Sequence, residues 1–258
     1  SIQQLANKTQ TPYLFPFCVS FNEPLNLYTF PLLPSLFDSF RFILNFFKSK
    51  NLEVKIVYDE TTKEKALTLT SPENLIDYQN PQLKTEAPKV ALIFVKDSHV
   101  EEVLAKTQGL SIRVLNYHQI NLASQSQDKT LWEDVLFINW VKSELKDAVK
   151  FFQETFQEKK QKKPNNYHML GWILADMVYE TLYKTTGKKN QQGNNLDIIK
   201  ELESLTQEKG YNEGCAYNLY YNSFDLPDPF KRLGISGLYF MKYSQKSFKI
   251  ISDFYPLN

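Results

Sequence analysis

A proline between two amphipathic helices is the feature that most constrains how this chain can fold. Before it, apolar residues recur at the four-, three- and four-residue spacing of a helix face, at Leu145, Val149, Phe152 and Phe156. The basic run at 159–163 suits a helix C-terminus, and Pro164 then stops the helix. A second, broader apolar stripe runs from Met169 to Leu182. The sequence therefore predicts one helix on each side of Pro164.

Short apolar runs elsewhere in the chain have the length of buried strands. They lie at 12–18, 54–58, 90–95, 112–117 and 135–140. Helical patterns at 36–50 and 100–106 alternate with these runs, and strand–helix–strand over 90–117 is typical of a right-handed βαβ unit. The polar stretch 121–129 is predicted as a loop. These patterns together predict an α/β protein with parallel sheets flanked by helices.

The last part of the chain predicts a different arrangement. A short amphipathic helix is expected at 196–205, followed by aromatic-rich strands at 217–221, 237–243 and 248–251. The last two strands are separated by only a few residues around 244–246. Strands joined by so short a connection pair as an antiparallel hairpin.

Composition and motifs exclude several classes of protein. The net charge is +1, so no global field attracts nucleic acid, and no apolar run is long enough to predict a transmembrane helix. The chain contains no phosphate-binding glycine loop, no nucleophile elbow, no C-x-x-C and no H-E-x-x-H sequence. We therefore expect no enzyme activity and no cofactor.

Histidines and cysteines give no clear chemistry. The three histidines, His99, His118 and His168, lack metal-ligand spacing, so no metal site is predicted. Cys18 and Cys215 are compatible with two free thiols, a disulfide or reactive groups, and buried free thiols are favoured.

Three segments in the same order resemble a known family. Residues 147–182 (DAVKFFQETFQEKKQKKPNNYHMLGWILADMVYETL), 40–60 (FRFILNFFKSKNLEVKIVYDE) and 11–25 (TPYLFPFCVSFNEPL) are similar to segments of the type I periplasmic binding proteins, the branched-chain amino-acid receptor family. The resemblance implies a two-lobed α/β fold with parallel sheets. It also implies strands before residue 12 that this sequence does not contain, so the first lobe is expected to be incomplete. The sequence would then be a fragment, or a shortened member of the family that pairs its open sheet edge with another copy.

The resemblance also implies lobe boundaries. Residues 1–31 and 136–215 would form the first lobe, residues 32–135 a shortened second lobe, and residues 216–258 a C-terminal hairpin that spans the two. In this arrangement the ligand sits between the lobes, against loops at the carboxyl ends of strands.

Matching the family's binding loops to this sequence gives a set of candidate ligand-binding residues. They are Phe17, Cys18, Val19, Lys63, Asp97, Ser98, His118 and Tyr167. Val19 lacks the hydroxyl that binds a carboxylate in the amino-acid receptors, and a histidine stands where their acidic residue pairs with an ammonium group. A zwitterion buried without paired charges costs several kcal/mol. A standard amino acid is therefore not the expected ligand.

The resemblance implies a non-catalytic solute-binding or sensing protein outside the cytoplasm, with its signal peptide absent from this sequence. Its partners would be a small molecule and a membrane transporter or receptor. The alternative is an interaction or structural protein that has kept the fold, lost the ligand, and uses its sheet edge to form a homodimer or to bind a partner. Neither hypothesis includes nucleic acid.

Overall fold

The computed structural model describes residues 2–14, 28–31, 36–85, 87–139, 147–164, 166–186, 195–204, 237–245, 247–252 and 255–256. These residues fall into two compact units. Unit 1 comprises residues 1–35, 141–237 and 256–258, and unit 2 comprises residues 36–140 and 238–255. The lobe boundaries expected above stay a prediction.

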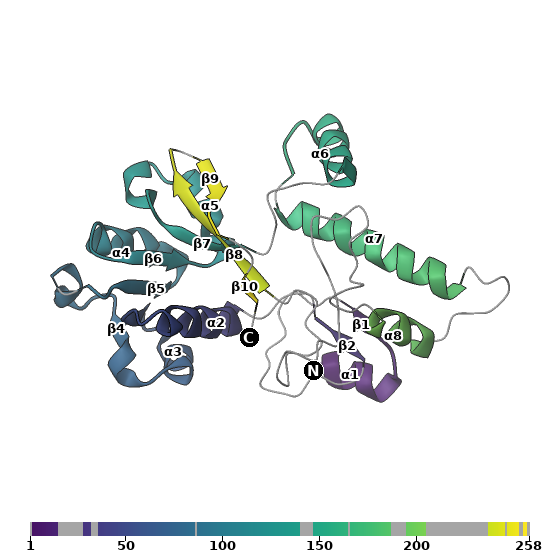
Figure 1. The fold of residues 1–258 in the computed structure, drawn as a ribbon, viewed down its shortest axis with the longest axis horizontal. Helices are drawn as coiled ribbons and strands as arrows, with labels where there is room; N and C mark the ends of the chain where they lie inside the picture. Colours follow the sequence, from purple (N-terminus) through teal and green to yellow (C-terminus); the bar gives the residue numbers. More distant parts are fainter. Residues whose placement is uncertain are drawn as a thin grey trace. The chain divides into compact units, whose positions relative to one another are not determined.

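Unit 2 is built on a mostly parallel sheet (Figure 1). Its neighbouring parallel strands, in spatial order, are β4 (Leu75–Asp77), β3 (Val54–Tyr58), β5 (Val90–Phe94), β6 (Ile112–Leu115) and β7 (Leu136–Asn139). Strand β8 (Gly237–Ser244) then pairs antiparallel with β7, and it also pairs with β9 (Ser247–Ile250) and β10 (Tyr255–Pro256). The antiparallel pairing of β8 with β9 confirms the predicted hairpin.

Helices cover both faces of this sheet (Figure 1). On one face lie α2 (Leu36–Ser49) and α3 (Lys63–Leu69), and on the other lie α4 (Val100–Thr107) and α5 (Ile120–Gln125). Right-handed crossovers require this arrangement, because the chain moves along the sheet in one direction through β5, β6 and β7 and in the other direction from β3 to β4. Short 3₁₀ turns connect these elements: η1 (Pro72–Asn74), η2 (Pro81–Lys84), η3 (Asp97–His99), η4 (Tyr117–Gln119) and η5 (Lys129–Trp132).

Strand β5 is buried on both faces, as its continuous apolar sequence predicts. Ala91 and Ile93 belong to the core beneath α4 and α5, where Trp132 stacks on Phe137 with ring centroids 6.2 Å apart. On the opposite face, the ring of Phe94 lies 5.1 Å from that of Phe40 in α2. Burial of an apolar side chain stabilises a fold by about 1.5–3 kcal/mol, so this strand anchors both helix layers.

Two local expectations were wrong in unit 2. The predicted loop 121–129 contains most of α5. Ile120, Leu122 and Ala123 pack against the core, and these contacts stabilise a short helix although its other residues are polar. The strand predicted at 112–117 ends at Leu115. Asn116 ends it because its side chain accepts a hydrogen bond from the Tyr117 amide and so starts η4.

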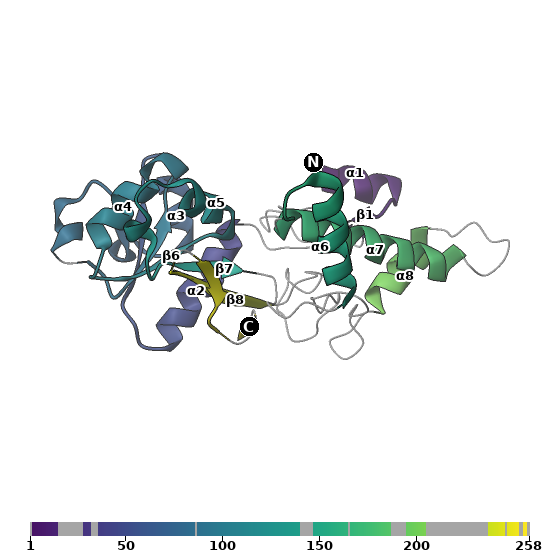
Figure 2. The same ribbon diagram turned by 90° about the horizontal axis from the view of Figure 1, so that it is seen from above.

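Unit 1 contains the helix pair around Pro164. Helices α6 (Asp147–Lys160) and α7 (Asn166–Thr186) contact each other through aromatic rings: Phe152 stacks on Trp172 with ring centroids 5.3 Å apart. Helix α7 also packs against α8 (Asn195–Glu203) (Figure 2). Helix α1 (Ile2–Thr9) precedes β1 (Tyr13–Leu14), which pairs in parallel with β2 (Thr29–Phe30). The strand predicted at 217–221 lies outside the described residues.

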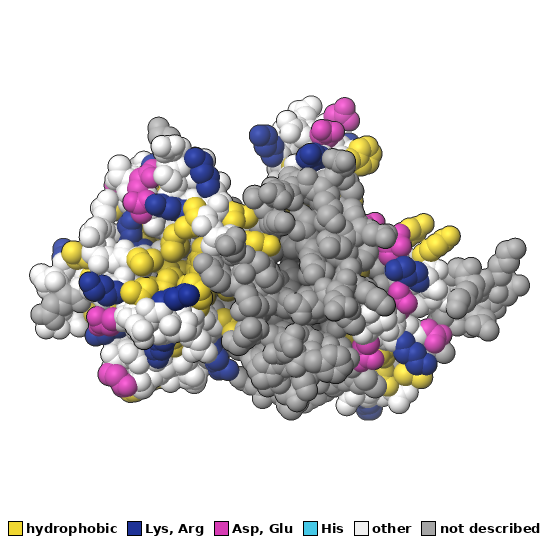
Figure 3. Space-filling view, viewed as in Figure 1, with side chains coloured by type: hydrophobic (Ala, Val, Ile, Leu, Met, Phe, Trp, Pro, Cys, Tyr) yellow, Lys and Arg dark blue, Asp and Glu magenta, His cyan; other side chains and the backbone are white. Residues whose placement is uncertain are grey.

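The α7 stripe is buried at Met169, Ile173, Leu174, Met177 and Thr181, as its spacing predicts. The prediction was wrong at Leu182, whose side chain is 41% exposed beside the exposed Tyr179 and Tyr183. Figure 3 shows hydrophobic side chains at the surface over α7, next to charged ones. The apolar face of α7 is therefore covered along most of the helix but not at its C-terminal end.

Arg113 ties the helix layer to the sheet. This β6 side chain is 4% exposed and donates hydrogen bonds to the backbone carbonyls of Leu131 (2.8 Å), Leu104 (3.5 Å) and Glu133. One guanidinium thus connects β6 to α4 and to the segment around η5. Hydrogen bonds from a charged donor are stronger than neutral ones, and a buried carbonyl left without a donor is costly.

We expect Arg113→Met to lower the free energy of unfolding by about 2–4 kcal/mol, because one buried hydrogen bond and two partly buried ones to backbone carbonyls lose their donor. Urea denaturation followed by circular dichroism measures this change. The matched control is Lys55→Met on strand β3, which is separated from β6 by β5. The Lys55 side chain is partly exposed, and its ammonium lies 3.7 Å from the Glu53 carboxylate. The control should change stability by less than about 0.5 kcal/mol. Equal effects of the two substitutions would contradict this role of Arg113.

Candidate functional site

The carboxyl ends of β3, β5 and β6 lie side by side in unit 2 and form the candidate site. Polar residues stand in the segments that follow these strands. Asp59 comes directly after β3 and Asn116 directly after β6, and Lys96 and Asp97 follow β5 after Val95. A strand buried on both faces has no room for such groups within its length. In open α/β sheets this edge is where ligands bind.

Four of the predicted binding residues lie at this edge. Lys63 is the exposed first residue of α3, Asp97 and Ser98 are exposed on η3, and His118 is exposed on η4. The structure brings Asp97 and His118 within electrostatic range of each other. Lys63 makes no hydrogen bond or ion pair with any part of the chain that the structure describes.

Two opposing effects act on the imidazole of His118. Desolvation lowers the pKa of His118 below its ordinary value, and the negative charge of Asp97 acts in the opposite direction. Because the residue as a whole remains exposed, water weakens the effect of the surrounding protein on this ring. The ring is thus available to a ligand as either a donor or an acceptor.

The remaining predicted residues belong to unit 1. Tyr167 is the second residue of α7, and the structure describes its backbone alone. Phe17, Cys18 and Val19 lie outside the described residues, as does Cys215. Their assignment to a ligand stays a prediction.

A buried carboxylate that the sequence did not reveal as part of the site organises this edge. The side chain of Asp59 is 1% exposed, and its Oδ1 accepts hydrogen bonds from the Thr61 hydroxyl (2.6 Å) and the Thr61 amide (2.9 Å). Its Oδ2 accepts a hydrogen bond from the Lys96 amide (2.8 Å) and lies 3.1 Å from His99 Nδ1. Asp59 therefore fastens the loop after β5 to the loop after β3.

Tyr78 extends this network beyond His99. Its hydroxyl lies 3.3 Å from His99 Nε2, and its ring stacks on the imidazole with centroids 4.4 Å apart. Because the ionised Asp59 can only accept, His99 Nδ1 carries a proton, and in the neutral ring Nε2 accepts from Tyr78. The Lys106 ammonium lies 5.3 Å from the centre of the Tyr78 ring and donates to the Tyr78 carbonyl. These contacts hold the Asp59 network in one arrangement.

Asn116 brings an unused hydrogen-bond donor to the same edge. The residue is 4% exposed, and its Oδ1 accepts from the Tyr117 amide at 2.7 Å. Its Nδ2 has no hydrogen-bond partner among the described residues. Buried amide donors are nearly always paired with protein, water or ligand. This donor is therefore suited to an added polar group at the carboxyl end of β6.

The described residues contain no group of three histidine, cysteine, aspartate or glutamate side chains that could hold a metal ion.

Gln119 links the loop after β6 to the loop after β5. Its Nε2 lies 3.3 Å from Asp97 Oδ1 and 3.4 Å from the Val95 carbonyl. The chemistry of this edge is hydrogen bonding and charge.

Comparisons with solved structures identify the fold. One similar structure is a branched-chain amino-acid ABC transporter protein of Thermus thermophilus with bound valine. The match covers 99% of this chain and 75% of the transporter protein's chain, with a TM-score of 0.68 and 14% sequence identity. The match to a fatty-acid ABC transporter substrate-binding protein from Thermomonospora curvata covers 99% of this chain and 71% of that protein, with the same TM-score and identity. An extracellular ligand-binding receptor from Rhodopseudomonas palustris matches 97% and 78%, with a TM-score of 0.62 and 12% identity.

The chain has the fold of the type I periplasmic binding proteins, as the resemblance implied. It spans about three quarters of the length of these three structures. No protein-family model and no curated protein match the sequence. Among the described residues, no helix is both long enough and apolar enough to cross a membrane.

The Asp59 network predicts a specific dependence of stability on pH. Burial alone would raise the pKa of Asp59, but the hydrogen bonds from Thr61, Lys96 and His99 outweigh it and lower the pKa from 3.8 to about 2. The group is thus more acidic in the folded state than in the unfolded state. Its contribution of about 2 kcal/mol is present above pH 3.8 and is lost as the pH falls through about 2.

We therefore expect Asp59→Asn to destabilise the protein by about 2 kcal/mol near neutral pH, with a difference from the native chain that shrinks below about pH 4. Urea denaturation at a series of pH values measures this. Glu60→Gln is the control, because it removes the same charge from an exposed neighbour. A difference for Asp59→Asn that stays constant down to about pH 2 would show that the carboxylate charge does not carry the effect.

Proposed function

We propose that this protein is a non-catalytic solute-binding protein that binds a small molecule at the carboxyl-terminal edge of the unit 2 sheet. The observation that carries the proposal is the parallel order of β3, β5 and β6, which places Lys63, Asp97 and Ser98, and Asn116 and His118 at one edge. The fold is that of proteins that bind solutes for ABC transporters, which supports the same role. Binding between two lobes stays a prediction from the resemblance.

The chemistry of this edge indicates the class of solute. Asp97 offers a carboxylate, His118 an imidazole, Ser98 a hydroxyl and Asn116 an unpaired amide donor. These groups suit a small polar molecule with several hydrogen-bonding atoms. Binding of a branched-chain amino acid in the way expected of the family is not favoured, because this sequence has other residues at the positions that bind a zwitterion in the amino-acid receptors.

The location and partners of the protein follow from the same proposal. The structural neighbours include an extracellular receptor and substrate-binding components of transporters. We therefore place the protein outside the cytoplasm, and its natural partner would be a membrane transporter or a receptor. The fold of its neighbours supports a binding protein rather than an enzyme.

A ligand-free interaction protein is the second candidate. The exposed side chains of Tyr179, Leu182 and Tyr183 on α7 favour it, since exposed aromatic groups are enriched at protein interfaces. Such a protein would form a stable dimer or bind a partner without taking up a small molecule.

A thermal-shift screen against amino acids, peptides, nucleosides and sugars, combined with light scattering, tests the proposal. A solute that binds only the folded protein raises the melting temperature as its concentration rises. At a concentration of 100 times its Kd, it adds about 2.7 kcal/mol to the free energy of unfolding. We expect a monomer with a saturable shift for one class of compound. A stable dimer with no shift for any class would refute the proposal and support the interaction protein.

The compound found in this screen then tests the site itself. We expect His118→Ala to weaken its binding by about tenfold, which corresponds to about 1.4 kcal/mol. Asn121→Ala is the control, because this exposed residue lies three positions further along, in the first turn of α5. Isothermal titration calorimetry gives both affinities. Unchanged binding by His118→Ala would place the solute elsewhere.

A further inference from the structure

The side-chain amide of Asn116 combines two features that together point to a ligand. The residue is buried, and its Nδ2 has no hydrogen-bond partner among the described residues. Burial of an amide donor without a partner is unfavourable, and such donors are rare in folded proteins. Asn116 also stands directly after β6, at the edge where open α/β sheets bind ligands. The group that pairs with this donor therefore bears on what the site recognises.

The orientation of this amide is fixed by its oxygen. Asn116 Oδ1 accepts a hydrogen bond from the Tyr117 backbone amide at 2.7 Å. A rotation of the side-chain amide by half a turn would place its NH₂ group against the Tyr117 N–H, and two donors cannot bond to each other. Nδ2 therefore stays on the side away from the Tyr117 amide.

Capping of η4 explains the oxygen of Asn116 but not its nitrogen. Aspartate, serine or threonine would supply the same capping acceptor without adding an NH₂ group. The acceptors of Asn116 itself are engaged, Oδ1 by the Tyr117 amide and the backbone carbonyl by the Gln119 amide at 3.1 Å. A solute hydroxyl or amine would bring a further hydrogen to this point. The donor is best matched by an oxygen that carries no hydrogen.

Burial limits the size of the group that can reach this donor. Asn116 is 4% exposed, whereas His118, two residues further along, is exposed. A solute that binds at His118 can therefore approach Asn116 with a small projecting atom but not with a bulky group. The oxygen of a carbonyl group has this shape.

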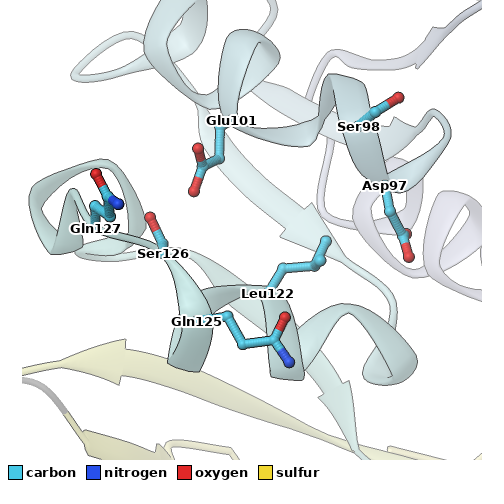
Figure 4. Close-up of a pocket in the computed structure, with 7 residues that line it drawn as sticks. All are labelled: Asp97, Ser98, Glu101, Leu122, Gln125, Ser126 and Gln127. Carbon is cyan, nitrogen blue, oxygen red and sulfur yellow. The ribbon is translucent and has the colours of Figure 1, made fainter.

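Asp97 sets the charge that this oxygen can carry. Gln119 connects the two residues, because its Oε1 accepts from the Asn116 backbone amide at 3.4 Å and its Nε2 lies 3.3 Å from Asp97 Oδ1. Figure 4 shows the Asp97 carboxylate directed away from Glu101. Its negative charge acts on His118 and would repel a second carboxylate at this edge. A neutral oxygen is therefore favoured over an anionic one.

We propose that Asn116 Nδ2 donates a hydrogen bond to a neutral carbonyl oxygen of the solute and so determines the specificity of the site. The proposal rests on the solute-binding function proposed above and narrows its solute to a ketone, an amide or an ester. Amines, alcohols and carboxylic acids would be disfavoured at this point.

Four small probes with the same number of non-hydrogen atoms test the proposal. They are acetone with a neutral carbonyl, 2-propanol with a hydroxyl, isopropylamine with an ammonium and acetate with a carboxylate. Each is titrated into the full chain labelled with nitrogen-15, and the Asn116 side-chain amide is followed by NMR. Probes this small bind weakly, so the titrations extend into the millimolar range.

We expect acetone to shift the Asn116 side-chain signals saturably and to bind at least about fivefold more tightly than the other three probes, the effect of one hydrogen bond. The side-chain amide of Asn74 is an internal control, because it already donates to Thr70 Oγ1 and Ser71 Oγ, both at 3.1 Å. Its signals should stay in place. No acetone shift at Asn116, or equal binding of 2-propanol or acetate, would overturn the proposal.

Two asparagine variants separate the donor from its surroundings. Asn116→Ser keeps an acceptor for the start of η4 but removes Nδ2, and it should weaken acetone binding at least about fivefold, measured at the His118 backbone amide. Asn121→Ser, at an exposed position in the first turn of α5, should leave the binding unchanged. Equal acetone binding by the native chain and Asn116→Ser would refute the role of Asn116. If Asn116→Ser does not fold, the four probes on the native chain still decide.

The outcome is separable from that of the proposed function. A solute found by the thermal-shift screen, together with no acetone shift at Asn116, would refute the role of Asn116 and leave the solute-binding function in place. A saturable acetone shift at Asn116 with no solute found in the screen would support the carbonyl contact and count against the wider function.

Discussion

The complete burial of the central parallel strand β5 governs the rest of unit 2. Strand β5 is buried at every position, so its backbone groups pair within the sheet and its side chains must be apolar on both faces. The guanidinium of Arg113 lies within β6 because backbone carbonyls bind it, whereas the polar groups of the candidate site lie at the points where strands end. Asp59, Asp97 and Asn116 all occupy such points, and the hydrogen bonds of Asp59 fix the spacing of two adjacent loops. The same constraint that builds the core thus assembles the binding edge.

Much of this architecture could be predicted from the sequence because it depends on local patterns. Continuous apolar runs gave β3, β5 and β7, and helical spacing gave α2, α4 and α7. Helix α5 was missed because its stability comes from contacts of Ile120, Leu122 and Ala123 with the core, while its other residues are polar. A short helix with so few apolar residues has no clear periodicity. Tertiary packing decided its structure.

The candidate site was predictable only in part, for a related reason. Asp97, Ser98 and His118 could be named from the resemblance, because the family's binding loops match segments that follow predicted strands. The role of Asp59 could not, although an aspartate directly after a buried strand is a signal, because its partners Lys96 and His99 lie 37 and 40 residues further along the chain. The unpaired amide of Asn116 depends on side-chain packing, which no sequence pattern records.

The pairing of β8 with β7 has a consequence for the order in which the protein can fold. Residues 136–139 receive their antiparallel neighbour from residues 239–242, and Met241 and Tyr243 complete the core beneath α4 and α5. During synthesis the ribosome makes the intervening segment of unit 1 before that neighbour emerges. Until then β7 is an open sheet edge that can pair with other chains. A chaperone that covers this edge would therefore protect the nascent chain from wrong pairing, whereas in the folded protein β8 already covers β7.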